Sequence, residues 1–256
     1  MIRFLSQEKA VVREALWAPA LNQLLSSLRV VKVLEFLGDR DEYWLKVKQS
    51  NHGVNLIVDG VTLDPTTTSQ VCRVIFRSPY NQLLQSAVFT QAFPYNLINL
   101  DYCGGGRWFE GQFRYAKYQE ITQTIDTNLQ CTDSFALLLT LDMADLIYPF
   151  YKAREDAIRD SLITDEILSF LDSLPDLDYR PTWMALIGNV LELQSFCQEK
   201  GYGLALQASP YTYIGKSDGH VTRMLSYALA LTKEGGDPEK EQSRLWASVK
   251  QVVWVA

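Results

Sequence analysis

The stretch YNLINLDYCG, residues 95–104, runs from apolar residues into an acid and then into three successive glycines, Gly104 to Gly106. Its apolar positions and the glycines that follow predict a buried strand. A second run, SFALLLTL at 134–141, is apolar at nearly every position. Such runs are typical of strands buried on both faces in the middle of a parallel sheet. The chain is therefore predicted to build its core around a parallel sheet.

Strand patterns alternate with helical patterns along the rest of the chain, which predicts one α/β domain with a mostly parallel sheet. Strands are expected at 30–38, 54–59, 71–76, 95–101 and 134–141, with an antiparallel closing pair at 203–209 and 223–231. Helices are expected at 6–28, 39–47, 81–89, 112–130, 144–173, 182–200 and 239–249. The predicted divisions are an N-terminal helical extension at 1–29, the α/β domain at 30–233 and a C-terminal helical tail at 234–256.

The composition excludes several classes of protein. Of 256 residues, 47% are hydrophobic, with 14 Gly and 9 Pro, which excludes a disordered or collagen-like chain. The net charge is −6, whereas a stand-alone nucleic-acid binder usually carries a basic surplus, so only a local basic face remains open. The four cysteines form no CxxC pair, and we expect reduced thiols and no metal site. No apolar run has the length of a membrane span, and we expect a soluble, cytoplasmic protein.

Glycines and polar residues stand where the predicted strands end. They are Gly38, Asp59, Arg77–Ser78 and Asp101–Gly106. Open parallel sheets bind ligands beyond the carboxyl ends of their strands, near a switch in strand order. We therefore expect the functional site at this edge of the sheet.

The order of the elements resembles that of the class I S-adenosylmethionine-dependent methyltransferases. Val33-Leu34-Glu35 resembles the family's first strand, and Asn99-Leu100-Asp101-Tyr102 resembles its fourth-strand motif. The resemblance covers residues 30–231. It implies a single Rossmann-like domain with a mostly parallel seven-stranded sheet, helices on both faces and an antiparallel final strand.

The resemblance also implies roles for the residues at the strand ends. Asp59 would accept hydrogen bonds from the ribose hydroxyls of S-adenosylmethionine, and Asp101 would orient the methyl acceptor. The implied residues are Glu35, Gly38, Asp39, Asp59 and Ser78 for the cofactor, Asp101 and Tyr102 for catalysis, and Gly104, Gly105, Arg107 and Trp108 for the substrate. Catalysis would consist mainly of aligning the acceptor with the methyl group.

Each of these features also has a structural interpretation. Asp101 could cap the next helix, with the glycines forming a turn. The aromatic and cationic residues from Arg107 to Tyr118 could stack on a nucleic acid, or could form an amphipathic helix with buried rings. Cys103 as a nucleophile and His220 as a base are weaker hypotheses, because sequence shows no activating neighbour for either.

Two functions from different classes remain open. The first is a methyltransferase that transfers a methyl group to a nucleic-acid or protein acceptor. The second is a pseudoenzyme, a catalytically inactive methyltransferase-like interaction subunit of a bacterial protein complex. Leu37 and Asp39 stand where the family has glycines that let the backbone approach the cofactor, which favours the second function. A nuclease or NTPase has no supporting motif.

Overall fold

The computed structural model describes residues 7–37, 41–102, 116–142, 179–217 and 220–254, together with 165, 169, 170, 172 and 173. Its helices are α1 (Gln7–Ser27), α2 (Asp41–Ser50), α3 (Tyr80–Leu84), α4 (Ala87–Thr90), α5 (Ala116–Leu129), α8 (Tyr179–Lys200) and α9 (Pro238–Val249). Its strands are β1 (Val30–Phe36), β2 (Asn55–Val61), β3 (Cys72–Phe76), β4 (Leu97–Tyr102), β5 (Ser134–Asp142), β6 (Gly203–Leu206), β7 (Tyr211–Ser217), β8 (His220–Thr232) and β9 (Val253–Trp254).

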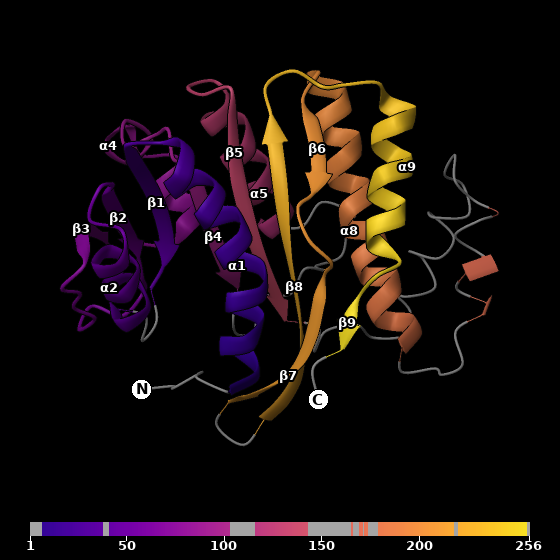
Figure 1. Cartoon of the computed structure of the whole chain (residues 1–256), viewed down its shortest axis with the longest axis horizontal. Coiled ribbons are helices and arrows are strands. Elements are labelled where there is room, and N and C mark those ends of the chain that lie inside the picture. The colour runs from indigo at the N-terminus through magenta and orange to yellow at the C-terminus, as the bar shows by residue number, and fades with distance from the viewer. Residues whose placement is uncertain are drawn as a thin grey trace.

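The strands form one twisted sheet in the order β3-β2-β1-β4-β5-β8-β7-β9, with β6 also paired to β8 (Figure 1). Strands β1 to β5 are all parallel. β8 runs antiparallel to β5 over the whole length of β5, from Ser134↔Thr232 to Asp142↔Met224. The predicted fold class, an α/β domain with a mostly parallel sheet and an antiparallel final strand, is confirmed by this order.

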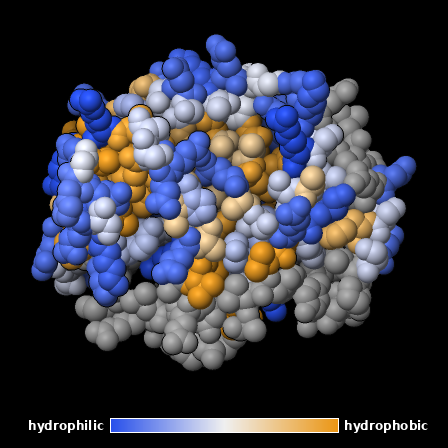
Figure 2. Space-filling view, viewed as in Figure 1, coloured by the Kyte–Doolittle hydropathy of each residue, from blue (hydrophilic) through white to orange (hydrophobic). Residues whose placement is uncertain are grey.

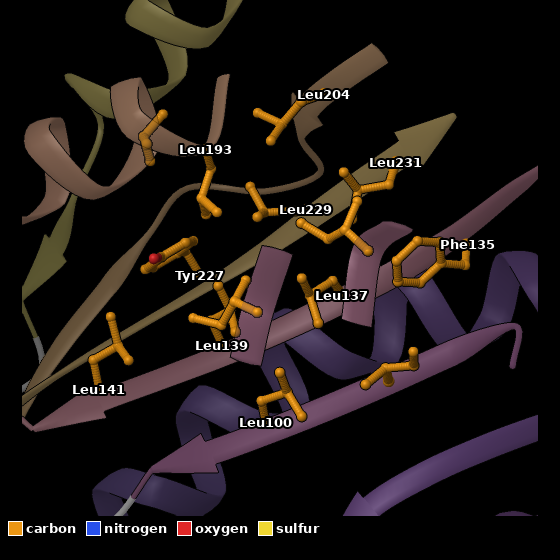
Figure 3. Packing of buried hydrophobic residues seen from close by; sticks show 14 of the residues in the cluster. Leu100, Phe135, Leu137, Leu139, Leu141, Leu193, Leu204, Tyr227, Leu229 and Leu231 are labelled. Carbon is orange, nitrogen blue, oxygen red and sulfur yellow. The ribbon is translucent and has the colours of Figure 1, made fainter. Parts of the chain in front are cut away.

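The position of β5 between two cores explains why its sequence has no polar face. Phe135, Leu137 and Leu139 join the core on the side of α5 and α8, whereas Ala136 and Leu138 join the core on the side of α1. Figure 3 shows the first of these cores, in which the β5 side chains meet Leu193 of α8 and Tyr227, Leu229 and Leu231 of β8. The strand is buried on both faces, as its apolar run predicts.

Helix α1 covers the opposite face of the sheet and runs in front of the strands in Figure 1. Trp17 of α1 is buried in this packing, with 5% of its surface exposed. Its ring stacks on that of Trp44 of α2, with the centroids 5.9 Å apart, and meets the Tyr43 ring edge-on, with the centroids 5.3 Å apart. Pro19 lies inside α1 and does not end the helix. Helices therefore cover both faces of the sheet, as predicted.

The sequence analysis missed two strands, β7 and β9. Residues 211–217 were expected in the loop of a closing hairpin, but they form β7, which pairs with β8 from Tyr211↔Ser226 to Ser217↔His220. The expected antiparallel pair does form, between β6 and β8. The two-residue strand β9 then joins the outer edge of β7 in parallel. The helix expected at 144–173 lies almost entirely outside the described residues.

No helix among the described residues is both long enough and apolar enough to cross a membrane.

Candidate functional site

The strand order reverses between β1 and β4, and this boundary positions the candidate site. From β1 the chain builds β2 and β3 outward on one side, and β4 then returns to the other side of β1. In open α/β sheets, ligands bind beyond the carboxyl ends of the strands at such a reversal. Glu35 and Asn99 are register partners across this boundary, Glu35 as the last residue but one of β1 and Asn99 as the third residue of β4.

Glu35 and Asn99 form a buried polar pair. Both residues are 0% exposed, and the Asn99 Nδ2 group donates a hydrogen bond to Glu35 Oε1 at 3.0 Å. Their side chains lie on the α1 side, because Val33 and Leu97, two positions earlier on the same strands, pack there. Among the described residues, Asn99 Oδ1 has no hydrogen-bond partner. A buried acceptor without a donor is uncommon and costs stability, so the site lacks one donor.

Asp101 lies two residues after Asn99 on β4, so its side chain faces the same side of the sheet. It is 9% exposed. It lines a small cavity beneath α1, whose other polar walls are Arg13 of α1, Thr140 of β5 and Ser226 of β8. The Thr140 and Ser226 hydroxyls are hydrogen-bonded to each other at 2.9 Å. Two predicted site residues, Glu35 and Asp101, are thus on the same face of neighbouring strands.

Tyr102 lies on the opposite face, in the core beside α5. Its ring meets Phe36 edge-on at 5.4 Å, and Lys117 Nζ lies 4.8 Å from its centroid. Burial and the Glu120 carboxyl raise the pKa of the Tyr102 hydroxyl well above its usual value. Burial also raises the pKa of Glu120. Asp101 and Tyr102, predicted to act together, therefore point to different sides of the sheet.

Asp59 belongs to a separate polar cluster. It is 0% exposed and precedes the end of β2 by two residues. Arg73 donates to both of its oxygens, from Nε to Oδ1 at 3.0 Å and from Nη2 to Oδ2 at 2.5 Å. The Tyr95 hydroxyl donates to Oδ2 at 3.0 Å, and Lys32 Nζ lies 4.6 Å from the Tyr95 ring centroid. Asp59 would have to exchange these partners before it could hold a ribose, and that role stays a prediction.

The remaining predicted residues are distributed as follows. Ser78 is half-buried in the turn between β3 and α3. Its neighbour Arg77 is exposed and donates from Nη2 to the Thr67 carbonyl at 2.9 Å. Gly38, Asp39, Gly104, Gly105, Arg107 and Trp108 lie outside the described residues.

Asn99 and Arg13 are site residues that the sequence analysis did not select. Asn99 had a visible signal, because it interrupts an otherwise apolar strand two residues before Asp101. No sequence signal pointed to Arg13, since an arginine in a predicted helix is usually exposed to solvent. Within the described part of the chain, no group of three or more His, Cys, Asp or Glu residues could hold a metal ion. Among the described cysteines, Cys72, Cys131 and Cys197 are not disulfide-bonded.

The strand order, with β8 antiparallel between β5 and β7, gives the chain a Rossmann-like fold of the class I methyltransferase type. No protein-family model and no curated protein match the sequence.

Three solved structures are similar to the chain at low identity. Precorrin-6y C5,15-methyltransferase from Geobacter metallireducens GS-15 is 10% identical, with a TM-score of 0.38 over 90% of this chain and 93% of that one. Human methyltransferase-like protein 13, in complex with SAH, is 13% identical, with a TM-score of 0.34 over 96% and 93%. The O-methyltransferase of a trans-AT PKS multienzyme from Brevibacillus brevis, in complex with S-adenosyl-L-homocysteine, is 12% identical, with a TM-score of 0.36 over 97% and 82%. The strand order, rather than these overall similarities, defines the fold.

Proposed function

We propose that this protein is an S-adenosylmethionine-dependent methyltransferase with a nucleic-acid or protein acceptor. The observation that carries the proposal is the buried Glu35–Asn99 pair, with Asp101 beside it, at the point where the strand order reverses. Polar side chains are costly to bury and are retained where they are hydrogen-bonded or bind a ligand. The fold alone would not justify this step, because one fold hosts many functions.

The residues present fit part of the proposed cofactor. S-adenosylmethionine would supply an electrophilic methyl group on a sulfonium centre. Glu35 and Asn99 offer oxygen acceptors for a cationic group, and no described residue donates to Asn99 Oδ1. Gly38, Asp39 and Ser78 would complete the cofactor site. Asp101 and Tyr102 would act at the end of β4, and Gly104, Gly105, Arg107 and Trp108 would bind the acceptor.

A second function is favoured by the contacts of Asp59. Because Arg73 and Tyr95 already occupy its oxygens, the acid assigned to the ribose is engaged within the protein. A protein that had lost its cofactor site could retain such a pair as part of its core. The second candidate is therefore an inactive, methyltransferase-like interaction subunit.

Transfer of a radiolabelled methyl group distinguishes the two functions. The protein is incubated with S-adenosyl-L-[methyl-³H]methionine and with separate RNA, DNA and protein fractions. Label in one fraction, reduced at least tenfold by Asp101→Asn but not by the exposed change Asp133→Asn, is the result that we expect. Absence of label from all fractions, together with absence of S-adenosylhomocysteine binding, would favour the interaction subunit.

A further inference from the structure

The buried charges of the protein divide into two groups on opposite faces of the sheet. Among the described residues, three acids are buried, Glu35, Asp59 and Asp101, and Arg13 is the only buried lysine or arginine. Asp59 has its own counter-ion, because Arg73 binds it at 2.5 Å. A buried carboxylate without a nearby cation tends to take up a proton, since burial disfavours its charged form. Asp101, which the proposed function places in catalysis, therefore needs a cation from another part of the fold.

Arg13 and Asp101 share the small cavity beneath α1. Of the described residues that line it, Asp101 is the only acid and Arg13 is the only cation. The cavity has a volume of about 10 Å³, close to the minimum for one water molecule, so the two side chains border the same narrow space. The other polar residues of its lining carry hydroxyl groups that are uncharged at neutral pH: Thr140, Tyr213, Ser226 and Tyr227. Arg13 is thus the counter-ion that the described part of the chain offers to Asp101.

Aromatic packing keeps the charge of Arg13 in this position. The Arg13 guanidinium carbon lies 5.2 Å from the centroid of the Trp17 ring, one turn further along α1. Trp17 is itself buried and meets the ring of Tyr43 on α2 edge-on. Arg13 is 9% exposed, and a cation beside an aromatic face is held more strongly where water is excluded. The guanidinium is therefore fixed over the sheet.

Two further ionisable groups, from β1 and α2, lie in the same neighbourhood. Burial and then the Glu35 carboxylate raise the pKa of the Tyr43 hydroxyl to about 12, whereas Arg13 lowers it. Tyr43 is therefore uncharged at neutral pH and cannot balance an acid. Glu35 is a second buried acid within electrostatic reach of this tyrosine, and Glu14 of α1 is exposed. Neither acid can replace Arg13 as a counter-ion for Asp101.

We propose that Arg13 is a positioning residue that holds Asp101 as a carboxylate in its place on β4. The part of Arg13 in methyl transfer rests on the proposed function, whereas its effect on the charge of Asp101 does not. Arg13 belongs to α1, which precedes the first strand, and Asp101 belongs to the sheet. The helix that the sequence predicts as an N-terminal extension is then a necessary part of the site.

A ¹³C NMR titration of the side-chain carboxyl carbons tests the charge of Asp101 without any cofactor. The Asp101 signal is assigned by its loss in Asp101→Asn. Between pH 5 and pH 8, we expect this signal to remain that of a carboxylate in the wild-type protein. In Arg13→Met the titration midpoint should rise by about two pH units or more, into this range, because burial then acts without a counter-ion. The exposed Asp133 provides the control signal in the same spectra and should not change.

Two further variants separate charge from packing. Arg13→Lys keeps the charge and should hold the Asp101 midpoint closer to the wild-type value than Arg13→Met does. Arg13→Met combined with Asp101→Asn should melt at a higher temperature than Arg13→Met alone, because the uncompensated carboxylate is gone. This melting test also serves if Arg13→Met is too unstable to titrate. The proposal is overturned if folded Arg13→Met keeps the wild-type midpoint, if Arg13→Lys shifts it as far as Arg13→Met, or if Asp101→Asn does not raise the melting temperature of Arg13→Met.

Methyl transfer by the same variants separates this inference from the proposed function. Relative to the wild type, Arg13→Met should transfer poorly at pH 6 and recover towards pH 8, where Asp101 loses its proton. An equal loss at both pH values would contradict the positioning role. Methyl transfer by the wild type with an unshifted midpoint in Arg13→Met would overturn this inference and leave the proposed function intact. A shifted midpoint without methyl transfer by the wild type would support the effect of Arg13 on Asp101 and remove its part in the reaction.

Discussion

At the residue scale, the contacts of Asp59 are the clearest case of a side chain whose role depends on distant partners. Arg73 lies 14 residues away in sequence and Tyr95 lies 36 residues away, yet both bind the same carboxylate. Sequence could predict an acid near the end of a strand. It could not predict these partners, because their meeting depends on the pairing of β2 with β3 and on where the chain enters β4.

The Asp59–Arg73 ion pair should contribute measurably to stability. Asp59 is 0% exposed and Arg73 is 52% exposed, so Arg73→Gln would leave a buried carboxylate with weaker partners. We expect the free energy of unfolding to fall by about 1–3 kcal/mol, less than for a fully buried pair because water reaches Arg73. Urea denaturation measures it. The control is Arg77→Gln, an exposed arginine that donates only to a carbonyl, and an equal loss in both variants would contradict the assignment.

Cys197 should be chemically inert in the folded protein. Its thiol is 1% exposed, and burial, reinforced by Glu241, raises its pKa to about 12. At pH 8 it is therefore protonated, and the thiol form is a poor nucleophile. In a Cys103→Ser background, an aromatic disulfide reagent should label the exposed Cys131 quickly and Cys197 only after unfolding. Equal labelling rates for the two thiols under native conditions would contradict this expectation.

At the scale of the elements, β5 and β7 show what sequence can and cannot predict. β5 was predictable because a strand buried on both faces needs apolar residues at consecutive positions, whichever strands pair with it. β7 was missed because Tyr211-Thr212-Tyr213 leads into Gly215, Asp218 and Gly219, which resemble turn residues. Its strand conformation depends on pairing with the first half of β8, which the sequence alone does not show. The strand pattern predicted a candidate site at the carboxyl ends of the strands, but it did not predict which side of the sheet each residue faces.

Helix α1 should behave as part of the core of the sheet. Trp17 is 5% exposed and packs in one cluster with Trp44 and the α1 face of β5 and β8. Trp17→Ala should lower the free energy of unfolding by about 3–5 kcal/mol, because it removes a large buried ring and leaves a cavity. Leu28→Ala, at a position that is 36% exposed, should cost much less. Hydrogen exchange should also show lost protection across α1. Unchanged stability in Trp17→Ala would mean that α1 does not stabilise the sheet.

At the scale of the whole molecule, the sheet brings together two segments that are 64 residues apart in sequence. The reversal of strand order sets β4 beside β1, and only this arrangement allows Asn99 to donate to Glu35. Because α1 covers one face and α5 and α8 cover the other, the side chains of β4 alternate between two environments. Asp101 therefore lines the cavity, whereas Tyr102 packs beside α5.

Calorimetric titration with S-adenosylhomocysteine tests the central claim, that the boundary between β1 and β4 is a cofactor site, most directly. We expect saturable binding at one site, and at about 100 times the dissociation constant a stabilisation of about 2.7 kcal/mol in a matching thermal melt. Glu35→Gln, which keeps the size of the side chain, should reduce the affinity at least about tenfold, whereas Glu42→Gln on the exposed surface should not. No binding heat and no thermal shift with the folded wild-type protein would contradict the claim.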